Sequence, residues 1–201
     1  MVWYRFEDLR VFRLSGRGLG RESGQAGKRK MREEKEKLRK AIENLESFRL
    51  DRRVAAIEVL ANLDSTESLR ILLGCLHDES WHLRERVTKI LGSQGKKVIP
   101  YLDGVIRKGL WYARASSAKS LGEIGEVEGM DLLLPLLEDE SRIVRKEAQK
   151  ALTKIISRNP TAVFNGYLSV KDPKFAHIFL ERIKKFDQKG YEVLTRQEEN
   201  G

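Results

Sequence analysis

An arginine that returns at a nearly constant interval is the feature that most restricts how this chain can fold. Successive intervals are 31, 30 and 31 residues, and a leucine follows each arginine by seven positions. The four arginines are Arg53, Arg84, Arg114 and Arg145. A period of this size indicates a stacked repeat array, in which each unit contacts only its neighbours and the array as a whole displays an extended binding surface.

Most of the positive charge lies in the N-terminal part of the sequence. The 201 residues carry a formal net charge of +9, and 34% of them are charged. Residues 1–30 hold eight Lys or Arg against three Asp or Glu, so this segment alone contributes +5. The repeat body is therefore mildly basic, and its high charged fraction is expected of many short helices that each have one solvated face.

The first 30 residues are expected to form a basic, glycine-rich extension rather than part of the array. Within it, residues 2–14 read as a strand, and residues 15–30 have too few apolar side chains to offset the entropy of ordering. Met31 begins a charged helical pattern, MREEKEKLRKAIENL. One hypothesis is therefore that translation starts at Met31, and a native peptide from within residues 1–30 would exclude it.

Beyond this extension, apolar residues recur at helical spacing in pairs of helices separated by short turns. The expected repeats are residues 31–63, 64–94, 95–125 and 126–158, closed by a degenerate unit over 159–187. Residues 188–201 are expected to form a polar tail. The helices of the later units are predicted over residues 67–77, 80–92, 98–108, 110–122, 129–138, 141–157, 160–168 and 173–186.

Helix ends also carry recognisable residues. Glycines at positions 92, 95, 122 and 125 are expected to end second helices, because glycine tolerates positive φ. Asn159 and Asp172 each precede a proline and are expected to cap the helices of the closing unit. Together these features predict an all-α fold, a right-handed α-solenoid of about five helical pairs.

Three segments resemble the second half of HEAT repeats, in the short subtype found in phycobilisome-lyase-like proteins. They are DESWHLRERVTKILGSQG from Asp78, ARASSAKSLGEIGEVEGMDLLLPLLED from Ala113 and DESRIVRKEAQKALTKI from Asp139. The resemblance covers about residues 31–158. It implies that the four periodic arginines form the family's arginine ladder and that Asp78 and Asp139 are its turn aspartates.

Such an aspartate accepts hydrogen bonds from amides at the start of the second helix and pairs with an arginine. We therefore expect the ladder to join neighbouring repeats, and a ligand-binding role for its arginines is the minor alternative. Ser47 and Lys108 stand at the aspartate position of the other two units, where weaker turns are expected.

A column of lysines follows the ladder arginines by five residues, at Lys89, Lys119 and Lys150. Since second helices line the concave surface of HEAT arrays, the resemblance implies that these lysines face one groove about 10 Å apart. Lys146 and Lys154 extend its positive end. The alternative is a solvated helix face, and the neighbouring residues Glu58, Glu85 and Glu147 would neutralise part of the field.

Two tryptophans, Trp81 and Trp111, each precede a ladder arginine by three residues, and Tyr112 and His82 are next to them. Aromatic side chains beside arginine serve as anchors at interfaces and as stacking platforms for bases. The alternative is that they pack under the preceding turn.

These patterns predict a non-catalytic scaffold or adaptor that binds a partner protein on the concave face of the array, and the lysines favour an acidic partner. The alternative is nucleic-acid binding through the basic N-terminal segment and the lysines, with a steep salt dependence. With one cysteine, Cys75, and no long apolar run, we expect a cytoplasmic monomer without a membrane span.

Catalysis is the least supported class, because no nucleophile, base and orienting residue can be placed together. Alkylpurine DNA glycosylases and phycobilin lyases share only the repeat with this chain. Deoxyhypusine hydroxylase binds iron through His-Glu pairs, and none of His77, His82 and His177 precedes a glutamate. We expect neither a metal nor another cofactor.

Overall fold

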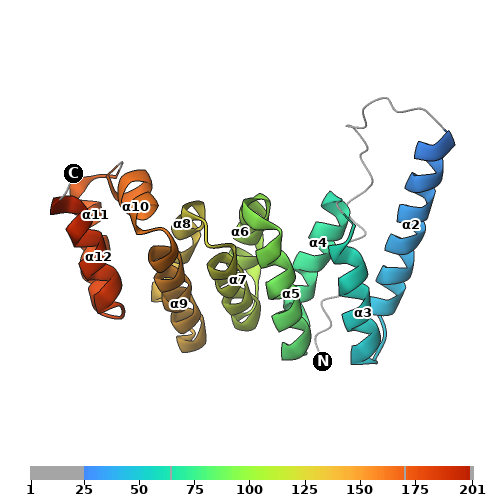
Figure 1. The fold of residues 1–201 in the computed structure, drawn as a ribbon. Helices are drawn as coiled ribbons and strands as arrows, with labels where there is room; N and C mark the ends of the chain where they lie inside the picture. Colours follow the sequence, from blue (N-terminus) through green and yellow to red (C-terminus); the bar gives the residue numbers. More distant parts are fainter. Residues whose placement is uncertain (1–24, 64, 170, 200–201) are drawn as a thin grey trace. The chain divides into compact units, whose positions relative to one another are not determined.

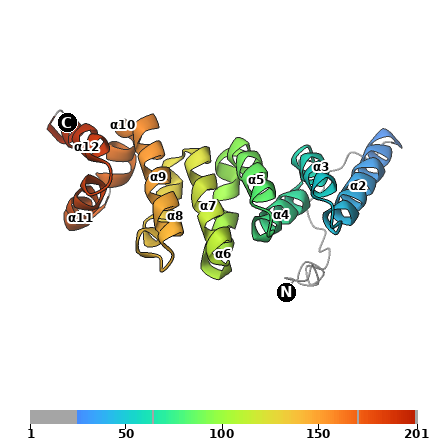
Figure 2. The same ribbon diagram turned by 90° about the horizontal axis from the view of Figure 1, so that it is seen from below.

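The computed structural model describes residues 25–63, 65–169 and 171–199, and every regular element in these ranges is a helix (Figures 1 and 2). The chain divides into two compact units, residues 1–87 and 88–201. Their boundary falls inside helix α5 (Trp81–Ser93). The predicted all-α solenoid class is confirmed.

The first unit is built from paired helices around an aliphatic core. Besides the first half of α5, its described elements are α2 (Gln25–Leu45), α3 (Leu50–Ala61), α4 (Thr66–Gly74) and the 3-10 turn η1 (Cys75–His77). Helix α2 packs on α3, and α3 packs on α4. The buried side chains recur at helical spacing, as Ile57 and Leu60 do on α3 and Leu69 and Leu72 do on α4.

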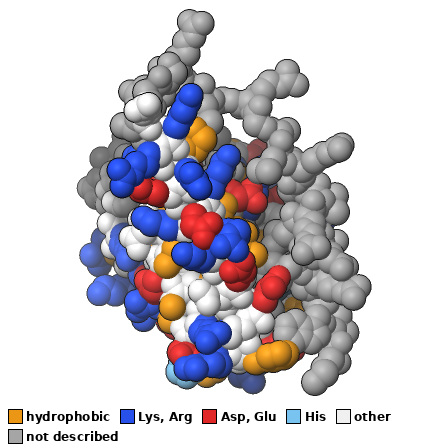
Figure 3. All heavy atoms as spheres, turned by 90° about the vertical axis from the view of Figure 1, so that its right-hand side faces the viewer, with side chains coloured by type: hydrophobic (Ala, Val, Ile, Leu, Met, Phe, Trp, Pro, Cys, Tyr) orange, Lys and Arg blue, Asp and Glu red, His pale blue; other side chains and the backbone are white. Residues whose placement is uncertain are grey.

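Helix α2 begins six residues before Met31, so the expectation of a loose segment is wrong for residues 25–30. The predicted strand over residues 2–14 lies outside the described residues. Ion pairs at helical spacing support α2, since Arg29 pairs with Glu33 and Arg39 pairs with Glu36. Figure 3, which views the side of the molecule where α2 lies, shows cationic and anionic side chains interleaved.

The second unit continues the pairing. Besides the second half of α5, its elements are η2 (Gly95–Val98), α6 (Ile99–Lys108), α7 (Trp111–Ile124), η3 (Val127–Gly129), α8 (Met130–Leu133), η4 (Pro135–Glu138), α9 (Arg142–Arg158), α10 (Pro160–Val163), the π-helical η5 (Phe164–Leu168), α11 (Pro173–Lys184) and α12 (Gln188–Glu199). Helix α7 packs along α9 and also contacts α6, and α9 packs on α8 and η4. Pro135 separates α8 from η4, because proline cannot donate a helical hydrogen bond.

The predicted polar tail is wrong for residues 188–199, which form α12 and pack on α11. Leu194 is fully buried, and Lys184 lies 5.0 Å from the ring centre of Tyr191. Asp187 accepts a hydrogen bond from the amide of Gly190 at 2.8 Å, at the start of this helix. Two apolar residues three apart, Tyr191 and Leu194, thus anchor an otherwise polar helix.

The two predicted caps of the closing unit differ. Asp172 accepts from the amide of Lys174 at 2.7 Å, as expected of a residue before an N-terminal proline. Asn159 makes no such side-chain bond, so that prediction is wrong. Its backbone amide instead donates to the carbonyl of Ile155 at 3.1 Å, which ends α9.

The four punctuating glycines have two different roles. Gly95 and Gly125 adopt φ of 69° and 76° just after second helices, as predicted. Gly92 and Gly122 lie inside α5 and α7, so the expectation that they end these helices is wrong. A Cβ on Gly122 would lie 2.9 Å from both the Cα and the Cβ of Ala151. The absence of a side chain is what lets α7 and α9 approach this closely.

We predict that Gly122→Ala lowers the free energy of unfolding by about 1 to 3 kcal/mol, because the added methyl group meets backbone that cannot move freely. Gly104→Ala on α6 is the matched control, since a Cβ there meets no described atom within 4 Å apart from its own helix backbone. The control should gain about 0.5 to 1 kcal/mol from reduced chain entropy. Urea unfolding measures both, and equal effects at the two sites would contradict the close approach.

Candidate functional site

Each ladder arginine binds the turn that precedes its own helix. One Nη1 atom donates to backbone carbonyls five or six residues earlier in the chain. The acceptors and distances are Ser47 for Arg53 at 3.0 Å, Asp78 for Arg84 at 2.6 Å, Gly109 for Arg114 at 3.0 Å and Asp139 for Arg145 at 2.6 Å. This contact recurs at all four ladder arginines and fixes where each second helix begins relative to its turn.

Two of these arginines also reach the turn aspartate of the following repeat, 25 residues further along the chain. Arg114 binds Asp139 through two parallel bonds, Nε to Oδ2 at 2.7 Å and Nη2 to Oδ1 at 2.9 Å. Arg53 approaches Asp78 more loosely, at 3.2 Å between Nε and Oδ2. A forked guanidinium–carboxylate pair is among the stronger hydrogen-bonding arrangements in proteins, so the ladder geometry is that of a link between repeats.

The turn aspartates also hold the amides of their own turns. Asp78 Oδ1 accepts from the amide of Ser80 at 2.7 Å, and Asp139 Oδ1 accepts from that of Ser141 at 2.8 Å. Ser47, at the aspartate position of the first repeat, accepts from the amide of Arg49 at 3.2 Å. The serine therefore performs the amide-binding part without a carboxylate.

The surroundings of Asp139 lower the pKa of its carboxyl group. Burial raises the pKa of its carboxyl, but hydrogen bonds from Arg114 and from the amide of Ser141 outweigh this effect, and the pKa lies below its ordinary value. A depressed folded-state pKa contributes stability that is present above the unfolded pKa and is lost as the pH falls through the folded value.

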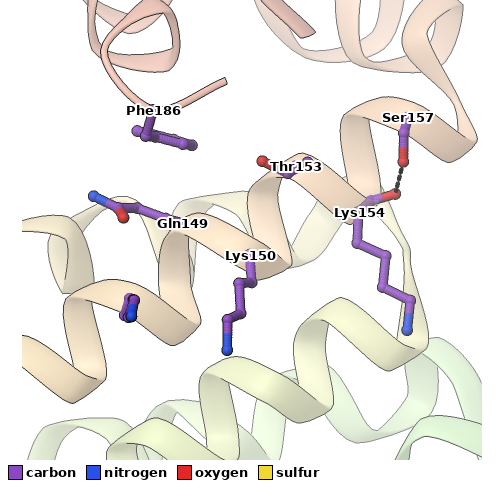
Figure 4. Close-up of a pocket in the computed structure, with 7 residues that line it drawn as sticks. Gln149, Lys150, Thr153, Lys154, Ser157 and Phe186 are labelled. Carbon is purple, nitrogen blue, oxygen red and sulfur yellow. Dashed lines mark hydrogen bonds between the residues drawn. The ribbon is translucent and has the colours of Figure 1, made fainter. Parts of the chain in front are cut away.

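Three lysines that sequence reasoning singled out line one hollow of about 490 Å³ on the second unit. Lys146, Lys150 and Lys154 lie four residues apart along α9. The remaining lining residues are Gln149, Thr153, Ser157 and Phe186, of which Phe186 follows the end of α11. Figure 4 shows the amino groups of Lys150 and Lys154 directed to one side of α9, whereas Phe186 lies on the other.

Of the predicted lysine column, only Lys150 lines the hollow. Lys89 on α5 and Lys119 on α7 do not line the hollow, which follows a single helix instead of crossing successive repeats. The charge of Lys119 instead affects Glu123 on the same helix. The pKa of Glu123 is lowered mainly by its hydrogen bond with Lys154 and to a smaller extent by the charge of Lys119.

Carboxylates neutralise part of the hollow's charge. Lys150 pairs with Glu147 at 2.7 Å, and Lys154 pairs with Glu123 of α7 at 2.6 Å. Among the described residues, the side chain of Lys146 has neither an ion-pair nor a hydrogen-bond partner. The hollow therefore contains one lysine side chain without a described partner, Lys146, and two that already form ion pairs within the protein, Lys150 and Lys154.

The aromatic candidates are surface residues rather than core. Trp81 is 61% exposed and stacks on His82 with ring centres 3.9 Å apart. Trp111 is 45% exposed and meets Tyr112 edge-on at 5.6 Å. Leu110 and Ile143, also near the starts of second helices in the second unit, are about half exposed.

Sequence reasoning missed two residues of this region. Phe186 lies in the closing unit, where the arginine period has faded and gives no register for aligning it. Glu123 carried a usable signal, because it stands 31 residues before Lys154, which is one repeat length. A periodic acid–base pair of that spacing can be sought in any array of this type.

The helical pairs and the arginine ladder define an all-α repeat protein. Residues 35–111 and 100–164 match the model of the HEAT repeat family, so together the matches cover well over half of the chain. The chain belongs to the HEAT-repeat family. A comparison with curated protein sequences finds no match.

The described residues contain neither a candidate membrane span nor a candidate metal cluster. No helix in this part of the chain has the length and apolarity needed to cross a bilayer. Likewise, no three His, Cys, Asp or Glu side chains in these ranges converge on a position where they could hold a metal ion.

We predict that Asp139→Asn lowers the free energy of unfolding by about 2 kcal/mol near neutral pH, because the amide cannot accept both bonds from Arg114. The difference from the unmodified protein should shrink as the pH falls below about 4. Chemical unfolding across a pH series measures it.

Asp103→Asn is the control, because its ion pair with Arg107 lies on the surface of α6, where the arginine side chain is 73% exposed. This variant should show no resolvable change. A stability loss for Asp139→Asn that stays constant down to acid pH would contradict an ionised Asp139 in the link.

Proposed function

We propose that this chain is a non-catalytic scaffold that binds an acidic partner protein along the exposed face of α9. The observation that carries the proposal is the hollow lined by Lys146, Lys150 and Lys154 with Phe186 at its side. A surface that combines cations with an aromatic side chain can both attract a partner and anchor it.

The packing beneath the hollow supports this role. On its inner side α9 buries Val144, Ala148, Leu152 and Ile155, and it approaches α7 at Gly122. A helix held in this way presents its outer face in one geometry, so that little conformational entropy is lost when a partner docks.

The alternating charges favour a protein over a nucleic acid. A nucleic-acid strand carries a negative phosphate at every nucleotide, and Glu147 and Glu123 would repel those phosphates next to the lysines. A protein segment can place a carboxylate opposite each lysine and a donor opposite each glutamate. The N-terminal residues 1–24, on which the nucleic-acid alternative also depends, lie outside the described residues.

The remaining features of the proposal rest on sequence. We propose the phycobilisome-lyase-like HEAT subtype from the turn aspartates and the arginine ladder, and a cytoplasmic location from the single cysteine. A monomer remains part of the proposal. Lys89 and Lys119 would steer the partner at longer range, and Trp81, Trp111 and Tyr112 would add contacts at the starts of the second helices.

We predict that Lys146→Glu combined with Lys150→Glu slows association with the native partner at least about tenfold at low salt, because steering depends on these charges. Lys108→Glu, an exposed reversal outside the hollow, is the matched control and should change the rate little. The partner is first captured from native lysate and then purified. Stopped-flow or surface-based kinetics with the purified partner gives the rates.

Thermal unfolding should be nearly unchanged in both variants, because Lys108, Lys146 and Lys150 are exposed and the surface pair of Lys150 with Glu147 contributes little. An association rate that the double reversal leaves unchanged, with folding intact, would contradict the proposed site.

A further inference from the structure

The three lysines of the hollow form a ladder along one helix. Lys146, Lys150 and Lys154 are successive i, i+4 positions of α9, so each step advances by about 6 Å along the helix axis. Their spacing is that of one face of an α-helix, which any segment lying along α9 would have to match.

From this geometry we infer that the occupant of the hollow is an amphipathic acidic helix, with carboxylates at spacings of four residues and an apolar side chain against Phe186. The inference rests on the proposed function and specifies the form of the partner. The amino groups of Lys150 and Lys154 lie on one side of α9, and Phe186 lies on the other (Figure 4). The acidic face of such a helix would meet the lysines, and its apolar face would meet Phe186.

The backbone of α9 argues for a helix rather than an extended peptide. Its amides and carbonyls are used within the helix, so the floor of the hollow offers side chains and no free backbone groups. An extended peptide gains affinity by pairing its backbone with an exposed strand edge, and the described residues contain no strand. A partner helix satisfies its own backbone and needs only side-chain contacts.

The existing ion pairs set the order in which the lysines contribute. The side chain of Lys146 has no partner among the described residues. A carboxylate of the partner can therefore bind it without displacing a carboxylate of this chain. Lys150 is 65% exposed in its pair with Glu147, and such a surface pair exchanges at little cost. Lys154 is held against Glu123 of α7 with both side chains about one third exposed. We therefore expect Lys146 to contribute most, Lys150 next and Lys154 least.

Phe186 supplies the apolar half of the site. Its position after α11 places an aromatic ring beside Gln149 and Thr153, both half-buried on α9. A leucine or phenylalanine of the partner helix that covers this ring removes apolar surface from water, which adds affinity without depending on salt. Binding should thus retain a salt-insensitive part when the charges are screened.

The test uses the full chain and synthetic helical peptides as probes. The first peptide carries Glu at i, i+4 and i+8 with Leu on the adjoining face. A second has the same composition with its Glu residues out of this register, and a third replaces Glu by Lys. Fluorescence anisotropy gives each dissociation constant, and circular dichroism confirms equal helicity of the peptides.

The in-register peptide is expected to bind at least about tenfold more tightly than the out-of-register one, which corresponds to about 1.4 kcal/mol. Lys146→Glu with Lys150→Glu should reverse the preference toward the Lys peptide, and Phe186→Ala should weaken the in-register peptide while Phe186→Leu retains most of its affinity. Lys108→Glu serves as the control and should behave as the unmodified protein does.

Three results would overturn the inference: equal affinity for the two registers, no effect of Phe186→Ala, or an oligonucleotide of equal charge that binds more tightly than the in-register peptide. The native partner separates this inference from the proposed function. If the lysine reversals abolish native binding but register does not matter, the inference fails and the scaffold function stands. If the reversals leave native binding intact, both the proposed site and the inference fail.

Discussion

The hydrogen bonds from a periodic arginine to the backbone of its own turn are the interaction on which the rest of this structure depends. In the four repeats that carry the arginine, the guanidinium reaches carbonyls five or six residues back, and in two of them it also reaches the aspartate of the following turn. Arg114 and Asp139 show this most fully, because their paired bonds connect the start of α7 to the turn before α9. The bonds within a turn fix where a second helix begins, and the link from Arg114 to Asp139 joins α7 to the turn before α9. Together with the close approach at Gly122, this link sets which face of α9 remains exposed.

The periodic part of the fold could be predicted from sequence because its determinants are local and repeated. The arginine interval, the apolar spacing and the positive-φ glycines Gly95 and Gly125 depend on backbone geometry that each repeat reproduces. The prediction for Gly92 and Gly122 is wrong because a glycine that permits close packing looks the same in sequence as a glycine that ends a helix. Only the neighbouring helix distinguishes the two cases, through Ala151 of α9 for Gly122 and Glu123 of α7 for Gly92.

Where the period fades, prediction weakened for a physical reason. The helix α12 is held by tertiary packing of Leu194 and Tyr191 against the closing unit, and its polar composition concealed that packing. Lys150 could be found from its offset to the ladder, and Lys146 and Lys154 from their positions on either side of it. Phe186 could not, because no repeat supplies its register. The sequence also could not predict that Lys150 and Lys154 lie on one side of α9 and Phe186 on the other. That arrangement depends on the relative directions of side chains on α9 and after α11 (Figure 4).

The site combines weakly held charges on the rigidly packed helix α9 with the aromatic ring of Phe186, which follows α11. We predict that an acidic helix bound there contacts these two segments. Amide chemical-shift mapping of the isotope-labelled full chain with the in-register acidic peptide tests this most directly. The largest shifts are predicted at residues 142–158 and around Phe186, with α2 and α3 unchanged. Largest shifts on α2, or around Trp111 at the start of α7, would contradict the account.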